Sequence, residues 1–98
     1  MLNITKNVRD DAVTLHVEGR LDTTTAPLLE TELQQVAGVA ALVLDLDGLS
    51  YISSAGLRVL LSAQKRTKGQ GDMKVVNACE AVMEIFDVTG FSDILHIE

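Results

Sequence analysis

Hydrophobic and polar residues alternate near the start of the chain, over residues 2–5 and again over residues 13–17. Alternation with a period of two is typical of a β-strand that buries one face against a core. Asp10 and Asp11, which lie between the two segments, favour a turn. The sequence therefore predicts an opening hairpin whose second strand directs its odd-numbered residues inward.

Apolar residues then recur every three or four positions in three segments, which predicts helices with one buried face. The first segment, residues 26–37, follows three threonines whose hydroxyls can cap a helix. It has Pro27 in its first turn and Gly38 just past its end, as expected for a helix with these boundaries.

The second helix is expected to begin at residues 53–54 and to end at residues 68–69. The third is expected to begin at Asn77, which precedes a glutamate by three residues as in a capping box, and to end at Gly90. Its core side would carry Val82, Ile85 and Phe86.

Short apolar runs between the helices predict strands that are covered on both faces. Residues 39–44 form one such strand, which the turn-forming residues 45–48 would close, and residues 73–76 form another. Residues 94–97 predict a last strand. Strands that alternate with helices imply crossover connections, so we expect one small α/β domain over residues 1–98, with a mixed sheet of about five strands and three to four helices.

Composition and charge argue against several classes of function. A formal charge of −6 and an aromatic content of 3% disfavour nucleic-acid binding, which needs a positive surface and stacking platforms. Cys79 is the single cysteine, so neither a disulfide framework nor a thiolate metal site is expected. The N-terminal residues lack the pattern of a signal peptide, and the longest apolar run is too short to span a bilayer. We therefore expect a cytoplasmic protein with no membrane insertion, cofactor or metal.

The segment from Leu44 to Leu60 stands out because it runs from a strand through hydroxyl-rich residues into a helix. The local pattern favours helix capping by Ser53 and Ser54, because a serine oxygen accepts a hydrogen bond from a free amide of the first turn. Gly56 weakens a helix by about 0.5–1 kcal/mol relative to alanine, which suggests that another backbone or a phosphate approaches it closely. The positive end of the helix would favour such an anion.

A phosphoserine at Ser54 would therefore be tolerated by the fold, whereas a partner docked over the same residues would be repelled. The phosphate adds a charge of about −1.5 to −2, and we expect Asp22, Asp45 and Asp47 to add like charge nearby. A loss of about 2.7 kcal/mol weakens binding about 100-fold, which is enough for a switch.

Residues 45–57, with the sequence DLDGLSYISSAGL, resemble the signature of STAS domains, the family of bacterial anti-sigma-factor antagonists and of the cytoplasmic domains of sulfate transporters. Residues 19–26, GRLDTTTA, resemble the family's second signature, and residues 86–91, FDVTGF, resemble the end of its C-terminal helix. The likeness covers essentially the whole chain.

The resemblance implies a STAS-type fold and a cycle between two partners. An anti-sigma factor with a histidine-kinase-like ATPase fold would phosphorylate a serine, and a metal-dependent serine phosphatase would remove the phosphate. The unphosphorylated antagonist would capture the anti-sigma factor and so free a sigma factor for transcription. Counting back from residues 56–57, the family's phosphorylated serine falls on Ser54.

The sequence departs from the family pattern on both sides of Ser54. Many members have an aspartate and a Ser or Thr where this chain has Ser53 and Ala55, which makes Ser53 a rival acceptor. Asp22 matches the family's acidic residue before the first helix and is the candidate neighbour of the phosphate. The residues expected to bind partners are Asp22, Thr23, Thr24, Asp45, Asp47, Ser53, Gly56, Leu57 and Arg58.

Other functions fit the sequence less well. A hydrolase with Ser54 as nucleophile would need glycine at position 52, which is isoleucine. A phosphate-accepting receiver domain would need an acidic pair after its first strand, whereas residues 10–11 precede a strand. We therefore expect no catalytic residues. A STAS scaffold that ignores phosphate, such as an accessory subunit of a lipid-transport system, stays open, and so does nucleotide binding.

Overall fold

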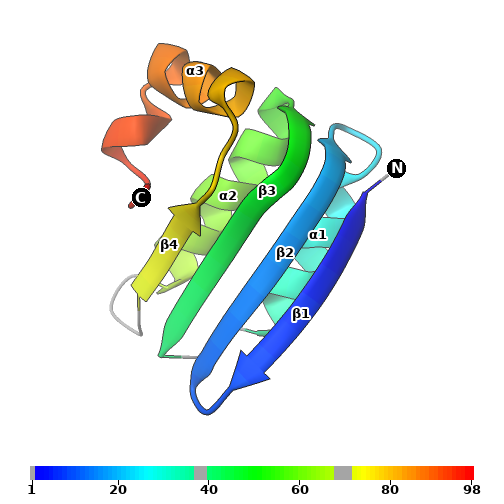
Figure 1. Cartoon of the computed structure of the whole chain (residues 1–98), viewed down its shortest axis with the longest axis vertical. Coiled ribbons are helices and arrows are strands. Elements are labelled where there is room, and N and C mark those ends of the chain that lie inside the picture. Colours follow the sequence, from blue (N-terminus) through cyan, green and yellow to red (C-terminus); the bar gives the residue numbers. More distant parts are fainter. Residues whose placement is uncertain (1, 37–39, 68–71) are drawn as a thin grey trace.

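The computed structural model describes residues 2–36, 40–67 and 72–98. Its elements in chain order are β1 (Asn3–Arg9), β2 (Ala12–Leu21), α1 (Ala26–Gln35), β3 (Ala41–Ile52), α2 (Ser54–Thr67), β4 (Asp72–Val76), α3 (Glu80–Thr89) and the 3-10 turn η1 (Phe91–Asp93). The described residues form one sheet in the order β1-β2-β3-β4, with β1 antiparallel to β2 and the other neighbours parallel (Figure 1). The expected mixed α/β architecture is confirmed.

The opening hairpin forms as predicted, although both strands are longer than the alternating segments. Asp10 has a φ of 54° in the turn, a left-handed conformation that aspartate tolerates better than most residues. In β2 the odd-numbered Val13, Leu15 and Val17 are buried, which confirms the direction of the alternation.

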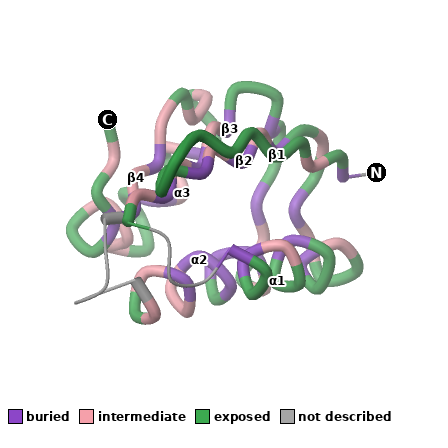
Figure 2. Tube along the Cα trace, turned by 90° about the horizontal axis from the view of Figure 1, so that it is seen from below, coloured by how far each residue is buried: buried purple, intermediate pink, exposed green. Residues whose placement is uncertain are grey.

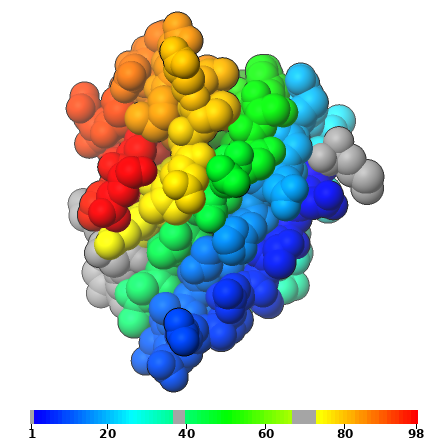
Figure 3. All heavy atoms as spheres, in the orientation of Figure 1, coloured from blue at the N-terminus to red at the C-terminus, as the bar shows by residue number. Residues whose placement is uncertain are grey.

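Helices α1 and α2 lie side by side against one face of the sheet, and Figure 2 shows them as a second layer beneath it. Leu29 and Leu33 of α1 and Leu60 of α2 are buried in the same core as the inward side chains of β2 and β3. The opposite face of β1, β2 and β3 is uncovered in the described part of the chain, and Figure 3 looks directly onto it. We call it the open face. Its central residues are His16, Glu18, Asp45 and Asp47.

Strand β3 is the largest departure from the expected elements, because it continues to Ile52 instead of ending at residue 44. Leu44 and Leu46 are buried while Asp47 is exposed, so the period of two continues as far as Asp47. It is interrupted at Gly48, which is also exposed, and Leu49 is buried again. The parallel pairing of β3 with β2 continues to Ile52, with register shifts between His16 and Glu18 and between Gly19 and Arg20. The prediction that residues 45–48 close the strand is therefore wrong.

Helix boundaries agree in part with the expectations. Helix α1 ends at Gln35 and α2 at Thr67, while the predicted stop residues Gly38, Lys68 and Gly69 lie outside the described residues. Helix α3 begins at Glu80, so the capping prediction for Asn77 is wrong. Asn77 instead has a φ of 60° and donates its side-chain amide to Asp45.

The C-terminal segment packs as expected but does not form a fifth strand. Val82 and Phe86 are fully buried, Ile85 packs against the core, and Gly90 ends α3 with a φ of 82°. Beyond η1, Ile97 makes a single parallel bridge to Val75, so the last predicted strand is reduced to one contact. No helix within the described ranges has the length and apolarity to cross a membrane.

Candidate functional site

The C-terminal ends of β2 and β3 lie together, where functional loops of parallel sheets gather. Leu21 pairs with Ile52, and the Ser53 amide donates a 2.8 Å hydrogen bond to the Leu21 carbonyl. The loop at residues 22–25 and the start of α2 at residues 53–58 are thereby held side by side. We call these two segments the Ser54 end.

The two adjacent serines have different structural roles. Ser53 is half-buried, and its hydroxyl accepts a long 3.4 Å hydrogen bond from the Gly56 amide while its carbonyl accepts one of 2.9 Å from Leu57. Ser53 is therefore the N-cap of α2. Ser54 is the first helical residue, is exposed, and its hydroxyl has no hydrogen bond within residues 2–36, 40–67 and 72–98. Only the second serine presents a free hydroxyl to solvent.

Gly56 has a packing role that differs from the predicted one. It is buried, and a Cβ atom there would lie 2.7 Å from Leu21 Cγ and 2.9 Å from Ile52 Cγ1. The missing side chain therefore lets the side chains of Leu21 and Ile52 pack against α2. The prediction that it lets another backbone or a phosphate approach is wrong. Leu57 is only 6% exposed and belongs to the core. Gly56 and Leu57 are therefore buried beneath the surface of α2, and the prediction that they contact a partner is wrong.

Asp22 organises the neighbouring loop. One of its carboxylate oxygens, Oδ1, accepts hydrogen bonds from the Thr24 hydroxyl at 2.8 Å and from the Thr24 and Thr25 amides at 3.0 and 3.2 Å. The Thr24 hydroxyl is the main cause that lowers the pKa of Asp22, and the two amides act in the same direction against partial desolvation. The Thr25 hydroxyl does not cap α1 as expected, because it lies 2.7 Å from the Arg20 carbonyl. Asp22 is thus a fixed negative charge at the Ser54 end.

A shallow groove of about 270 Å³ runs between α1 and α2 beside Ser54. Thr23 and Arg58, which were both predicted to contact partners, line it together with Ala55. The other lining residues are Ala26, Pro27, Glu30, Val59 and Ser62. Arg58 is exposed and makes no ion pair with any described residue.

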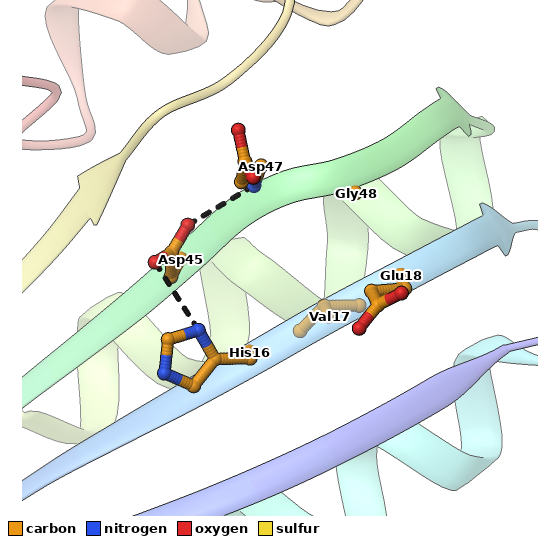
Figure 4. Close-up of a pocket in the computed structure, with 6 residues that line it drawn as sticks. All are labelled: His16, Val17, Glu18, Asp45, Asp47 and Gly48. Carbon is orange, nitrogen blue, oxygen red and sulfur yellow. Dashed lines mark hydrogen bonds and ion pairs between the residues drawn. The ribbon is translucent and has the colours of Figure 1, made fainter.

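Asp45 and Asp47 lie elsewhere, on the open face (Figure 4). Asp45 is 3.2 Å from His16 Nδ1, and its other oxygen accepts hydrogen bonds from the Asp47 amide at 3.0 Å and from the Asn77 side chain at 3.1 Å. Asp45 and Asp47 precede Ile52, the end of β3, by seven and five positions, which at about 3.3 Å per position is an extended span of roughly 23 and 17 Å. Both spans are well beyond the screening length of about 8 Å at physiological salt.

These two aspartates are therefore not neighbours of Ser54, and the prediction that they repel a phosphate there is wrong. Together with Glu18 and Gly48 they line a depression of about 300 Å³ on the open face. Within the described ranges, no three His, Cys, Asp or Glu side chains are arranged to hold a metal ion. The alternation of Leu44 and Leu46 with the two aspartates is the signal in the sequence that could have placed them on a strand.

Comparisons with known proteins identify the family of this chain. The STAS-domain family model matches residues 3–98. An anti-sigma-B factor antagonist of Bacillus subtilis is 32% identical over 98 residues, which cover 98% of this chain and 90% of the relative. The antagonist of the same name in Listeria monocytogenes is 30% identical over 103 residues, covering 99% of this chain and 90% of the relative.

Solved structures share the fold at lower identity. An anti-sigma factor antagonist from Mycobacterium paratuberculosis superposes with a TM-score of 0.91 at 24% identity, covering 99% of this chain and 85% of that one. Unphosphorylated SpoIIAA, an anti-sigma factor antagonist, gives a TM-score of 0.81 at 16% identity, covering 100% and 88%. Phosphorylated SpoIIAA of Bacillus gives 0.74 at 15% identity, covering 100% and 91%.

Proposed function

The chain belongs to the STAS-domain family, and from this premise we propose that it is an anti-sigma-factor antagonist switched by phosphorylation of Ser54. The unphosphorylated protein binds an anti-sigma factor that is also a serine kinase, and so frees a sigma factor for transcription. Phosphorylation releases the antagonist. The observation that carries the proposal is the exposed hydroxyl of Ser54, which makes no hydrogen bond to any described residue, beside a serine that is already engaged as the helix cap.

The proposed modification is a phosphoryl transfer in which the chain is the substrate. A bond forms between Ser54 Oγ and the γ-phosphorus of ATP, the bond from that phosphorus to ADP breaks, and a base of the kinase takes the hydroxyl proton. The fold accommodates the product because Ser54 faces solvent and the capping bond is made by Ser53. This leaves α2 and its packing on the sheet in place.

The partner, in contrast, meets a changed surface. The proposed interface consists of Ser54 with Ser53 and Arg58 from the start of α2, and of Asp22, Thr23 and Thr24 from the loop that the Ser53–Leu21 hydrogen bond holds alongside. A phosphate of charge about −1.5 to −2 must be desolvated there, next to the fixed charge of Asp22. A penalty of about 2.7 kcal/mol weakens binding roughly 100-fold.

Two further components complete the proposed cycle. The kinase has a histidine-kinase-like ATPase fold, and a metal-dependent serine phosphatase regenerates the active antagonist in the cytoplasm. Support comes from relatives that are themselves named anti-sigma-B factor antagonists and that align along nearly the whole chain. The chain itself acts by binding, without catalysis.

The test is to locate the phosphate. The protein is incubated with candidate anti-sigma kinases and Mg-ATP, and the product is mapped by mass spectrometry, alongside Ser54→Ala and Ser53→Ala. Phosphate is expected on Ser54 in the parent and in Ser53→Ala, and absent from Ser54→Ala. Label that persists in Ser54→Ala moves the site to Ser53 or beyond. A chain that is never phosphorylated but binds a transport subunit would instead be a STAS scaffold.

A further inference from the structure

Arg58 lies one helical turn after Ser54, at the i+4 position of α2. Residues at this spacing are neighbours on a helix surface, and an anion that precedes a cation by four residues is the favourable order. Both residues are exposed, and Arg58 is the one basic residue in the first two turns, residues 54–61. Its guanidinium has no carboxylate partner within the described ranges.

The geometry of α2 also directs Arg58 toward the phosphorylation site. Long side chains on an α-helix lean toward its N-terminus and cover the preceding turn, which here carries Ser54 and Ala55. Arg58 lines the groove between α1 and α2 together with Ala55 and Thr23 from the Ser54 end. Glu30 of α1 lines the same groove but forms no ion pair with Arg58. A guanidinium in this position is within reach of a phosphate on the Ser54 hydroxyl.

The other basic groups near these elements are occupied or distant. The Arg20 guanidinium lies 4.4 Å from the centre of the Tyr51 ring, and Lys74 pairs with Glu98 at 3.2 Å. Lys65 is exposed but is 11 residues from Ser54, about 16 Å along the helix. We therefore propose that Arg58 is the intramolecular counter-ion of phosphorylated Ser54.

This assignment gives phosphorylation a second effect on the interface. Before modification, the Arg58 guanidinium is free to pair with a carboxylate of the partner. After modification it is held by the phosphate of its own helix, with two parallel hydrogen bonds available to a phosphate group. The phosphate thus adds negative charge to the docking surface and withdraws a positive charge from it. This part rests on the proposed function, whereas the counter-ion role itself does not.

The test does not need a kinase. Phosphoserine is installed at position 54 during translation, and the second pKa of the phosphate is measured by 31P NMR titration in the parent chain, in Arg58→Gln and in Lys65→Gln. A nearby cation favours the dianion, so Arg58→Gln is expected to raise this pKa by roughly 0.2–0.4 units. Lys65→Gln, which removes the same charge from the far end of α2, is expected to shift it by less than about 0.1 unit because of distance and screening.

Binding to the anti-sigma factor supplies the second measurement. Arg58→Gln is expected to weaken binding of the unphosphorylated chain by a few-fold, and to reduce the affinity ratio between the two forms of the chain. A phosphate pKa that is equal in Arg58→Gln and the parent overturns the inference, whatever the binding results. If the pKa shifts while phosphate leaves parental binding unchanged, the counter-ion role stands and the proposed function fails.

Discussion

The Ser54 end and the open face both carry acidic side chains and hydroxyls, but the two regions use them differently. On the open face, Asp45 is held by His16, Asn77 and the Asp47 amide, so its charge is tied into a network. At the Ser54 end, Asp22 is similarly fixed by its own loop, yet the Ser54 hydroxyl beside it has no partner in the described structure. The Ser54 end is the candidate switch because a fixed carboxylate there lies near a hydroxyl that is free to accept a phosphate.

The comparison also shows that distance along the chain is a poor guide to electrostatic influence. Asp47 precedes Ser54 by seven residues but lies back along β3 on the open face. Asp22 precedes Ser54 by 32 residues, and the bond from the Ser53 amide to the Leu21 carbonyl brings its loop alongside. Matched substitutions, one at the Ser54 end and one on the open face, test this difference.

The largest contrast is expected from the same glycine substitution in both regions. Gly56→Ala places a Cβ against Leu21 and Ile52, both buried, and should lower the free energy of unfolding by about 1–3 kcal/mol, partly offset by better helix propensity. Gly48→Ala meets Glu18, whose exposed side chain can turn aside, and should lose less stability. Denaturant unfolding of the two variants measures the difference. Equal losses would contradict tight packing of α2 on the sheet at Gly56.

The next largest effect on stability is expected from removing serine hydroxyls. Ser53→Ala removes the cap of α2 and should lower the free energy of unfolding by about 1 kcal/mol. Ser50→Ala removes an exposed hydroxyl that donates to the Gly19 carbonyl, and a change within about 0.5 kcal/mol is expected. Thermal unfolding of both variants and of Ser54→Ala checks the order. A Ser54→Ala protein that loses more stability than Ser53→Ala would reverse the roles of the two serines.

A smaller effect should depend on pH and be lost in acid. The pKa of Asp22 is lowered from its ordinary 3.8, chiefly by the Thr24 hydroxyl, so its stabilising contribution is complete above 3.8 and is lost as pH falls through the lower folded value. The stability advantage of the parent chain over Asp22→Asn should therefore shrink as the pH falls below 3.8. Asp47→Asn is the control, because the Asp47 carboxylate accepts no hydrogen bond from any described residue. Unfolding curves from pH 6 to pH 2.5 make the comparison, and an advantage that does not change with pH would refute it.

The smallest effect is expected from the open face on partner binding. Asp47→Asn removes a charge far from Ser54 and should change the affinity for the anti-sigma factor by less than about twofold, because screening limits its reach. Titration calorimetry at physiological salt measures this, with Asp22→Asn as the variant near the interface. A larger effect from Asp47 than from Asp22 would move the interface to the open face.

The sequence predicted the alternation of strands and helices, the hairpin and the location of Ser54, because each depends on local periodicity or on a contiguous motif. It did not predict the length of β3, since Asp45, Asp47 and Gly48 favour turns and only pairing with β2 keeps them extended. The different roles of Ser53, the helix cap, and Ser54, the exposed first residue of α2, could not be predicted from the sequence either. They depend on where the strand ends, which is set by the bond to Leu21, a residue more than 30 positions earlier.

Gly56 illustrates the same limit at the candidate site. Helix propensity alone predicts that Gly56 weakens α2, which suggests a bound ligand as compensation. The compensation comes from tertiary packing against Leu21 and Ile52. A single sequence does not reveal which distant side chain fills the space that a glycine leaves.

The central claim is that a phosphate on Ser54 leaves the fold intact and weakens partner binding. The most direct measurement compares chains with serine and with phosphoserine at position 54, by amide NMR spectra and by calorimetric titration with the anti-sigma factor. We expect spectral changes confined to residues 22–25 and 53–58 and an affinity that falls roughly 100-fold, about 2.7 kcal/mol. Unchanged affinity, or spectral changes throughout the sheet, would contradict the account.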